Sequence, residues 1–285
     1  MSLSICVCGA GTMGSGIAQV AAQHNFDTIL FDIDEAAVKK AGGVISKHLL
    51  YLADKNKITR KEKEATEQRI FFTHHINECT ADIIIEAIAE NEDAKVSLFN
   101  TLAKYNDPET IFASNTSSLS INSLQQKIVA PERVIGMHFF NPAYIMKLVE
   151  VVKGNETSDE TATVVHDVCL QMNKTPVICN DAPGFIVNRI ARHYYLESLR
   201  LAEDKVARFE DIDTILESSG FKMGPFKLMD LIGMDINLAV SESLYHAFRE
   251  EIRFAPSPLQ IEKVHKGELG KKTGKGFYDY SNEKT

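Results

Sequence analysis

A glycine-rich turn near the start of the chain limits the folds that the sequence can adopt. The sequence Gly9-Ala10-Gly11-Thr12-Met13-Gly14 has the spacing G-x-G-x-x-G, and it joins a strand pattern over residues 3–8 to a helical pattern from Met13 to about His24. In such a turn the first glycine permits the tight bend, the second lets the backbone approach a pyrophosphate, and the third lets the helix pack closely on the strand. The N–H groups at the helix start then face the phosphates. The pattern predicts a doubly wound α/β fold with a dinucleotide site at Gly9, Gly11, Thr12, Met13 and Gly14.

An acidic residue at the end of the next strand supports this prediction and indicates which dinucleotide binds. Asp32 closes a strand pattern over residues 27–32, 23 residues after Gly9, near the separation of about 20 at which a carboxylate binds the ribose hydroxyls. The alternative is an ordinary acidic residue at a strand end. A carboxylate here repels a 2′-phosphate, and Ile33 and Asp34 supply no cation to receive one. We therefore expect NAD rather than NADP.

The order of strand and helix patterns predicts two domains. After Pro183 the strand patterns stop and long helical patterns follow. We expect an α/β Rossmann-type NAD-binding domain over residues 1–182, with an inserted helical hairpin at 35–68 that breaks near Asn56, followed by an all-α C-terminal domain over residues 183–285. The remaining strands are expected at 81–85, 111–114, 134–139, 148–152 and 175–179, and the later helices at 185–203, 209–218 and 234–252.

Composition excludes several classes of function. The 285 residues include 31 Lys and Arg against 39 Asp and Glu, a net charge of −8, which disfavours general nucleic-acid binding. No apolar run approaches the roughly 20 residues of a membrane span, and we expect a cytoplasmic protein. Five cysteines without a C-x-x-C pair indicate neither a metal site nor a disulfide framework. Cys6 and Cys8 are interpreted as small buried side chains.

Two titratable residues interrupt apolar strand patterns. His138 lies in Val134-Ile-Gly-Met-His-Phe-Phe140, and Glu150 lies in Leu148-Val-Glu-Val-Val152. A buried carboxylate needs a partner, and a histidine on a neighbouring strand can supply one. Such a pair suits alcohol oxidation, in which imidazole accepts the hydroxyl proton and the carboxylate stabilises the imidazolium. The pattern alone is equally compatible with a satisfied core histidine and a solvent-facing glutamate on an edge strand.

Two further polar segments stand where ligands bind in such folds. Ser114-Asn-Thr-Ser-Ser118 follows the strand at 111–114, at the carboxyl end where ligands of open α/β sheets bind, although serine and threonine also cap helices. Pro183-Gly-Phe-Ile-Val-Asn-Arg189 opens the second domain. Its proline is structural, but Asn188 lies near the domain junction, a usual location for substrate sites.

The hairpin region carries a local excess of positive charge. Between Lys39 and Lys63 there are eight basic residues and two acidic ones, a local charge of +6 in an acidic chain. A solvated helix face accounts for most of them. The functional alternative is a surface that binds a polyanion such as coenzyme A.

These motifs together resemble the 3-hydroxyacyl-CoA dehydrogenase family, from the glycine turn to Gly274-Lys-Gly-Phe-Tyr278 near the C-terminus. The most specific are Ser114–Ser118, Gly136-Met-His-Phe-Phe-Asn-Pro142, Met146-Lys-Leu-Val-Glu-Val151 and Pro183–Arg189. The resemblance implies a Rossmann-type domain, a helical domain that dimerises, and NAD-dependent oxidation of 3-hydroxybutyryl-CoA or a similar thioester.

The resemblance also implies roles for individual residues. His138 is then the catalytic base with Glu150 as its partner, and Ser117 and Asn188 bind the 3-oxygen and the thioester region of the substrate. Lys55 is the best-matching coenzyme A contact, with Ser117 also on the substrate side. The implied NAD contacts outside the glycine turn are Asp32, Glu90, Lys95, Asn115, Ser117, Asn141 and Lys272.

Two positions depart from the family pattern. Tyr144-Ile145 stands where the family usually has Pro-Val, and His48 stands at a hairpin position where relatives often carry a small polar residue. A bulkier loop between His138 and Glu150 is expected to narrow or rehydrate the acyl pocket.

Three other functions compete with this interpretation. One is a dehydrogenase for another 3-hydroxyacyl-CoA, such as a dicarboxylic one. Another is a non-catalytic NAD-binding protein on the same scaffold, which does not need Ser117, His138, Glu150 and Asn188. The last is a dehydrogenase for a free 3-hydroxy acid, which leaves the basic hairpin unexplained.

Overall fold

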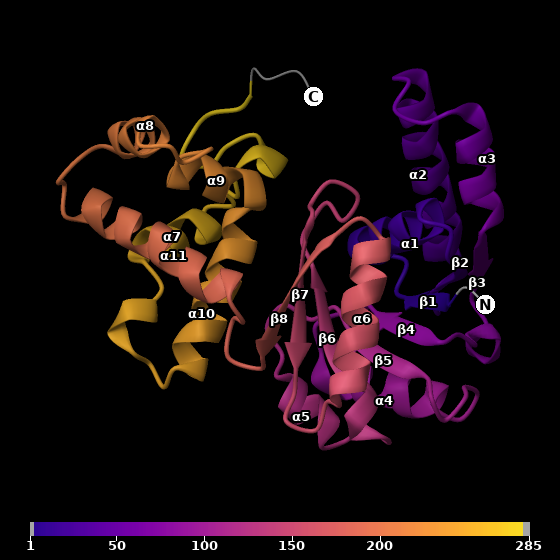
Figure 1. The fold of residues 1–285 in the computed structure, drawn as a ribbon. Helices are drawn as coiled ribbons and strands as arrows, with labels where there is room; N and C mark the ends of the chain where they lie inside the picture. Colours follow the sequence, from indigo (N-terminus) through magenta and orange to yellow (C-terminus); the bar gives the residue numbers. More distant parts are fainter. Residues whose placement is uncertain (1–2, 282–285) are drawn as a thin grey trace. The chain divides into compact units, whose positions relative to one another are not determined.

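The computed structural model of the protein describes residues 3–281. The chain divides into two compact units between Ala182 and Pro183 (Figure 1). The first unit contains all the strands named below, and the second is helical.

The first unit is built on an eight-stranded sheet with the order β3-β2-β1-β4-β5-β6-β7-β8. All neighbouring strands are parallel except β6 and β7, which are antiparallel. The mostly parallel sheet with helical crossovers confirms the predicted α/β Rossmann-type fold. The strands are β1 (Ser4–Cys8), β2 (Asp27–Phe31), β3 (Ile70–Thr73), β4 (Ile83–Glu86), β5 (Ile111–Ser114), β6 (Val134–Phe139), β7 (Leu148–Lys153) and β8 (Thr175–Asn180).

The sequence did not indicate β3. This strand has four residues and lies at the edge of the sheet. Its two central residues, Phe71 and Phe72, are exposed. The strand therefore lacks both the length and the alternation of buried and exposed residues by which a strand is recognised.

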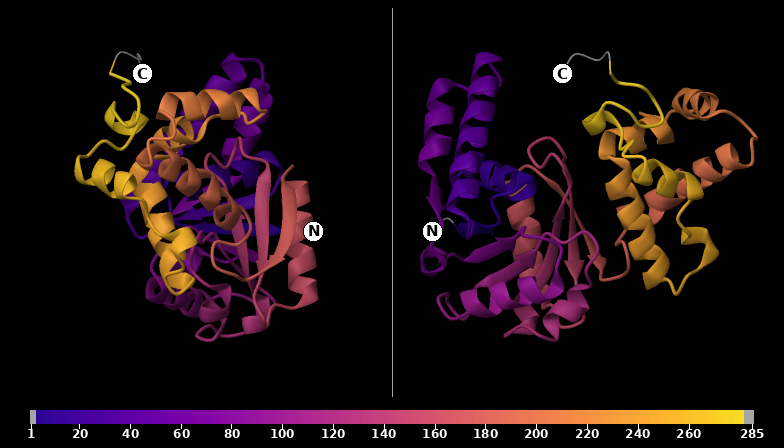
Figure 2. Two further views of the ribbon diagram at one scale, coloured as in Figure 1. Left: turned by 90° about the vertical axis from the view of Figure 1, so that its left-hand side faces the viewer. Right: turned by 180° about the vertical axis from the view of Figure 1, so that it is seen from behind.

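Helices connect these strands, and two of them form the inserted hairpin. The hairpin consists of α2 (Glu35–Asp54) and α3 (Arg60–Gln68), which lie side by side in Figures 1 and 2. The predicted break near Asn56 lies between them, where Asn56 has a left-handed φ of 53°. Thr59 and Glu62 then form a reciprocal capping box that starts α3. The other helices are α1 (Thr12–Gln23), α4 (Glu92–Leu102), α5 (Ile121–Gln125) and α6 (Asp159–Gln171), with short 3-10 turns η1 (Ile76–Glu78) and η2 (Pro131–Arg133).

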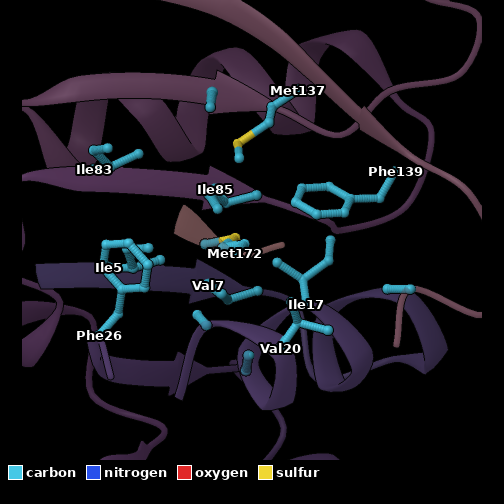
Figure 3. Close-up of a cluster of buried hydrophobic side chains, with 14 of the residues drawn as sticks. Ile5, Val7, Ile17, Val20, Phe26, Ile83, Ile85, Met137, Phe139 and Met172 are labelled. Atoms are coloured by element: carbon cyan, nitrogen blue, oxygen red, sulfur yellow. The ribbon is translucent and has the colours of Figure 1, made fainter. Parts of the chain in front are cut away.

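The central strands are apolar because they are buried on both faces. Figure 3 shows Ile17 of α1 beside Val7 of β1, with Ile85 of β4 and Met137 of β6 on the strands beyond. All four side chains are 0% exposed. This packing fixes α1 against the sheet and thereby fixes the glycine turn that precedes it.

The second unit is a helical bundle with an aromatic core. Phe226 is 0% exposed, and its ring packs edge-on against Phe277 with 4.7 Å between the ring centroids. The helices are α7 (Val187–Glu203), α8 (Phe209–Ser218), α9 (Pro225–Ile232), α10 (Met234–Ala247) and α11 (Pro258–His265), with 3-10 turns η3 (Ile252–Phe254) and η4 (Lys271–Thr273). The helix expected at 234–252 ends at Ala247, because Arg249 and Glu250 adopt left-handed φ values of 53° and 64°. Within residues 3–281 no helix is both long and apolar enough to cross a membrane.

The aromatic core of the second unit makes a stability prediction. Phe226→Ala removes a fully buried ring and should lower the free energy of unfolding by about 3–5 kcal/mol, measured by urea denaturation of the full chain. Ile215→Ala, at a side chain of α8 that is 64% exposed, is the control and should change it by less than about 0.5 kcal/mol. Equal effects of the two substitutions would contradict this assignment of the core.

Candidate active site

Most of the predicted site residues of the first unit lie at one edge of the sheet. Strands β1, β2, β4, β5 and β6 are parallel, so their carboxyl ends lie at the same edge. Backbone hydrogen bonds continue past the strand ends and tie the loops together. Gly9 N–H donates to Phe31 at 2.7 Å, Ala87 N–H to Cys8 at 2.7 Å, and Asn115 N–H to Glu86 at 2.8 Å.

The glycine turn at this edge needs glycine for different reasons at each position. Gly9 has a φ of +110°, and a Cβ on it would lie 2.5 Å from the carbonyl oxygen of Ala87. A Cβ on Gly14 would lie 1.7 Å from the carbonyl oxygen of Gly9, so this glycine permits the close packing of α1 on β1. A Cβ on Gly11 would meet no atom of the described residues within 4 Å. The protein itself therefore does not require glycine at position 11, whereas a pyrophosphate against the backbone would.

The carboxylate of Asp32 is hydrogen-bonded to this turn. Its Oδ2 accepts a hydrogen bond from Ala10 N–H at 2.7 Å, and its Oδ1 accepts one from Asp34 N–H at 3.0 Å. The carboxylate is thus fixed between the glycine turn and the start of α2. This geometry suits a group that receives the ribose hydroxyls of a dinucleotide.

A buried ion-pair network supports the loop after β4. The Nζ of Lys95 lies 2.6 Å from Oε1 of Glu86 and 3.2 Å from Oε2 of Glu90. The side chains of Lys95 and Glu86 are 1% and 0% exposed. Burial raises the pKa of Glu86, opposed by the Lys95 ammonium. Burial also acts to raise the pKa of Glu90, but Lys95 and nearby hydroxyl donors outweigh it, and the net shift is downward.

Glu90 in turn shapes the polar segment after β5. Its Oε1 accepts hydrogen bonds from Thr116 Oγ1 at 2.5 Å, from Ser117 N–H at 3.1 Å and from Ser118 Oγ at 2.8 Å. Asn115 points the other way, and its Oδ1 accepts from Phe139 N–H at 2.9 Å. The segment 114–118 is therefore an organised loop that links the end of β5 to the strand of His138.

His138 and Glu150 form a direct pair across two strands. They are cross-strand partners in the antiparallel β6–β7 ladder, and Nδ1 of His138 lies 2.7 Å from Oε2 of Glu150. The two residues are 6% and 1% exposed. The alternative of a solvent-facing glutamate on an edge strand is wrong, because β7 lies between β6 and β8. A buried carboxylate that grips one imidazole nitrogen leaves the ring oriented for acid–base work through the other.

The other predicted site residues lie on further elements of the two units. Lys55 is the exposed C-cap of α2 at the hairpin tip, and Asn141 is exposed in the loop after β6. Asn188 and Lys272 belong to the second unit. Asn188 lies in the first turn of α7, and the Nζ of Lys272 binds both carboxylate oxygens of Asp235 at 2.5 and 2.7 Å.

Sequence patterns missed two residues that shape this edge. Glu86 ends the apolar run Ile83-Ile84-Ile85, so it carried the same signal, a lone acid in a buried strand, that identified Glu150. Lys174 lies in the turn before β8 and is 7% exposed. A lysine next to an asparagine in a polar turn gives no sequence signal of burial.

The cysteines are free and mostly buried. Cys6 and Cys8 are both 0% exposed on β1, with 3.9 Å between their sulfur atoms. Across residues 3–281, the structure groups no set of three or more His, Cys, Asp and Glu side chains that could hold a metal ion.

The residues at this edge fit a dinucleotide. Among residues 3–281 no side chain caps the start of α1, where Gly11 is the N-cap, so the N–H groups of its first turn suit an anionic pyrophosphate. The surrounding glycines permit the approach, and Asp32 stands at the distance along the chain that the ribose requires.

Comparison with known proteins identifies the family. Residues 4–182 match the family model of the 3-hydroxyacyl-CoA dehydrogenase NAD-binding domain, and residues 184–280 match that of the 3-hydroxyacyl-CoA dehydrogenase C-terminal domain. The chain belongs to the 3-hydroxyacyl-CoA dehydrogenase family, and its cofactor is NAD.

Individual relatives cover nearly the whole chain. A 3-hydroxyadipyl-CoA dehydrogenase from Escherichia coli is 45% identical over 99% of this chain, which spans 60% of that protein's length. A probable 3-hydroxybutyryl-CoA dehydrogenase from Deinococcus radiodurans is 43% identical over 96% of this chain and 99% of its own length. A crystal structure of 3-hydroxybutyryl-CoA dehydrogenase from Escherichia coli superimposes with a TM-score of 0.96 at 44% identity, covering 100% of this chain and 61% of the other.

The contrast between Gly11 and Gly14 gives a test of the cofactor site. Gly11→Ala should leave the melting temperature nearly unchanged and raise the Kd for NADH on the order of tenfold, because the added methyl meets only the pyrophosphate. Gly14→Ala should instead destabilise the fold by more than about 3 kcal/mol, because the methyl meets the backbone of Gly9. NADH fluorescence titration and thermal unfolding separate the two effects. Normal NADH binding by a folded Gly11→Ala variant would contradict the proposed phosphate position.

Proposed function

We propose that this chain oxidises (S)-3-hydroxyacyl-CoA thioesters, 3-hydroxybutyryl-CoA in particular, to the 3-oxoacyl-CoA with NAD, and catalyses the reverse reduction. The observation that carries the proposal is the buried His138–Glu150 pair, at 2.7 Å. His138 lies on β6 and Glu150 on β7. β6 is the neighbour of β5, and the loop that follows β5 adjoins the cofactor site. The names of the relatives support the choice of substrate.

The chain's own residues perform the acid–base part of this reaction. Bound NAD, held by the glycine turn and Asp32, would supply the acceptor for the hydride that leaves the substrate carbon. Nδ1 of His138 is committed to Glu150, so Nε2 is the nitrogen that we assign to the substrate hydroxyl. His138 accepts the proton as the alcohol is oxidised and returns it in the reduction. Glu150 stabilises the imidazolium, and its charge therefore matters more in the transition state than in the ground state.

The remaining site residues are assigned by position and resemblance. Ser117 and Asn188 bind the oxygen and thioester region of the substrate, and Lys55 binds coenzyme A phosphate. Besides the glycine turn, the NAD contacts are assigned to Asp32, Glu90, Lys95, Asn115, Ser117, Asn141 and Lys272. The burial of Lys95 between Glu86 and Glu90 makes its part in NAD binding one of fixing Glu90 and the loop that Glu90 holds.

The second domain is assigned to substrate binding and to homodimer formation. Large apolar side chains on α7 and α10 are exposed in the single chain, at fractions of 67% for Ile190 and 51% for Ile236, and contact with a second copy of the chain would cover them. The five free cysteines favour a reducing compartment, the cytoplasm.

A second candidate is the same reaction on a dicarboxylic substrate such as 3-hydroxyadipyl-CoA. The 45% identity to the Escherichia coli enzyme of that name favours it. A purely NAD-binding role is disfavoured, because burying a histidine and a carboxylate together has a cost that cofactor binding alone does not require.

The substrate class is tested by NADH oxidation with acetoacetyl-CoA set against free acetoacetate. We expect turnover with the thioester and little with the free acid. Lys55→Ala should raise KM for acetoacetyl-CoA with little change in kcat, because at saturating substrate the nucleotide still occupies the hairpin and only its affinity is reduced. Equal activity on the two compounds would overturn the proposed substrate class, and an unchanged KM at low ionic strength would remove Lys55 from it.

The catalytic pair is tested by Glu150→Gln, which keeps the shape of the side chain and removes its charge. We expect kcat to fall by about 10²–10⁴-fold, as it should for His138→Ala. NADH affinity should stay near that of the unmodified protein. The double variant should be little worse than the poorer single one, because the two residues act as a unit.

Stability measurements give the control for this experiment. If the pair only stabilised the core, Glu150→Gln would lower the melting temperature while the folded fraction kept its kcat. A folded Glu150→Gln protein with normal turnover would therefore refute the mechanism.

A further inference from the structure

The loop between β6 and β7 (residues 140–147, the β6–β7 loop) is the shortest covalent link between His138 and Glu150. The next cross-strand pair along the ladder is Phe139 with Val149, and the loop follows directly. Its displacement would move the ends of both catalytic strands.

The base of the β6–β7 loop is held by a buried lysine. Nζ of Lys174 donates hydrogen bonds to the carbonyl oxygens of Ala143 and of Met146, the latter at 2.9 Å. Lys174 is 7% exposed, and burial lowers its pKa to about 8. The lysine thus holds the two backbone positions that flank Tyr144 and Ile145, the tip of the loop.

The tip of the β6–β7 loop contacts the hairpin and the cofactor helix. The ring of Tyr144 lies against the ring of His48 on α2, with 4.0 Å between centroids. Tyr144 and Ala143 also pack on Gly16 of α1, where a methyl group added to the glycine would lie 3.2 Å from the Cβ of Ala143 and 3.8 Å from the Tyr144 ring. The loop therefore has a fixed base at Lys174 and a tip that depends on side chains of other helices.

His48 is itself fixed and faces the same side of α2 as Lys55. Its Nδ1 lies 3.0 Å from Oε1 of Gln19 on α1, and burial lowers the pKa of the ring, which favours its neutral form. The separations His48–Tyr51 and Tyr51–Lys55 are three and four residues, so these side chains lie along one face of the helix. The Nζ of Lys55 lies 5.9 Å from the centre of the Tyr51 ring.

We propose that the contact between His48 and Tyr144 transmits binding of the coenzyme A nucleotide on the hairpin to the catalytic strands. This inference rests on the proposed function. It assigns Tyr144 as a positioning residue that makes turnover depend on the part of the substrate remote from the reacting carbon. Binding energy from a remote part of a substrate raises kcat when it is used to position the reacting groups. The His48–Tyr144 contact can couple nucleotide binding to this positioning, because His48 lies on the hairpin and Tyr144 lies on the loop that joins His138 to Glu150.

The test compares acetoacetyl-CoA with acetoacetyl-pantetheine, which has the same reacting end and lacks the nucleotide. We expect the unmodified protein to turn over the full thioester with the higher kcat. Tyr144→Val should lower kcat for acetoacetyl-CoA by about 10- to 100-fold and should change kcat for acetoacetyl-pantetheine by less than about twofold. His48→Gln should have the same selective effect, and the double variant should be no worse than either, because they break one contact.

Three further variants separate positioning from general damage. Tyr144→Phe keeps the ring and should restore the preference for the full thioester. Leu50→Ala, an exposed position on another side of α2, should leave both activities unchanged. Lys174→Met removes the base of the loop and should lower kcat for both compounds alike.

The outcomes separate this inference from the proposed function. Equal losses of kcat on the two thioesters in Tyr144→Val would make Tyr144 a structural residue and overturn the inference, as would an unchanged kcat on both. An unmodified protein that reduces neither thioester would instead overturn the proposed function itself.

Discussion

The hydrogen bond between His138 and Glu150 is made across the antiparallel strand pair that interrupts an otherwise parallel sheet. A carboxylate that is 1% exposed is stable only with a partner. Strand β6 continues the parallel series, and β7 returns beside it in the opposite direction. That return places Glu150 directly opposite His138. A slip of one residue in the β6–β7 register would turn Glu150 to the other face of the sheet, so the fold of this hairpin and the chemistry of the pair depend on the same register.

The first unit contains a second set of buried charges, the Glu86–Lys95–Glu90 network, which positions a loop. Glu86 and Lys95 are almost wholly buried, and Lys95 connects Glu86 to Glu90. Glu90 then holds Thr116, Ser117 and Ser118 through its carboxylate. A buried ion pair contributes little net stability, but it fixes the orientation of the side chains that form it. Here the network positions the loop after β5, and Asn115 of that loop is bonded to the strand of His138.

More of the fold than of the candidate site could be predicted from the sequence. The glycine turn predicted the α/β class, and the apolar runs located seven of the eight strands. Most of these strands are apolar because they are buried, whereas β8 is apolar in sequence although none of its side chains is buried. The strand Ile70–Thr73 was not predicted because it is short and its central side chains are exposed at the edge of the sheet. Within the site, His138 and Glu150 stood out as lone titratable residues in apolar strands. Their pairing depends on register, which a pattern along one strand does not contain, and the role of Lys174 depends on a tertiary contact.

The two departures from the family pattern show most clearly that a sequence pattern does not reveal which residues meet in the folded chain. Tyr144 and His48 are separated by 96 positions in the chain, so the sequence indicates two separate changes, one near the acyl pocket and the other on the hairpin. In the structure their rings are in contact, at 4.0 Å. Two substitutions that meet in space are one feature, because a small residue at either position would leave the other ring without its neighbour. The departure at Tyr144 is therefore better explained as a link between the hairpin and the catalytic strands than as a change in pocket volume alone. Under the proposed function this link makes the hairpin part of the catalytic unit, whereas the charge of the hairpin by itself indicates only a binding surface.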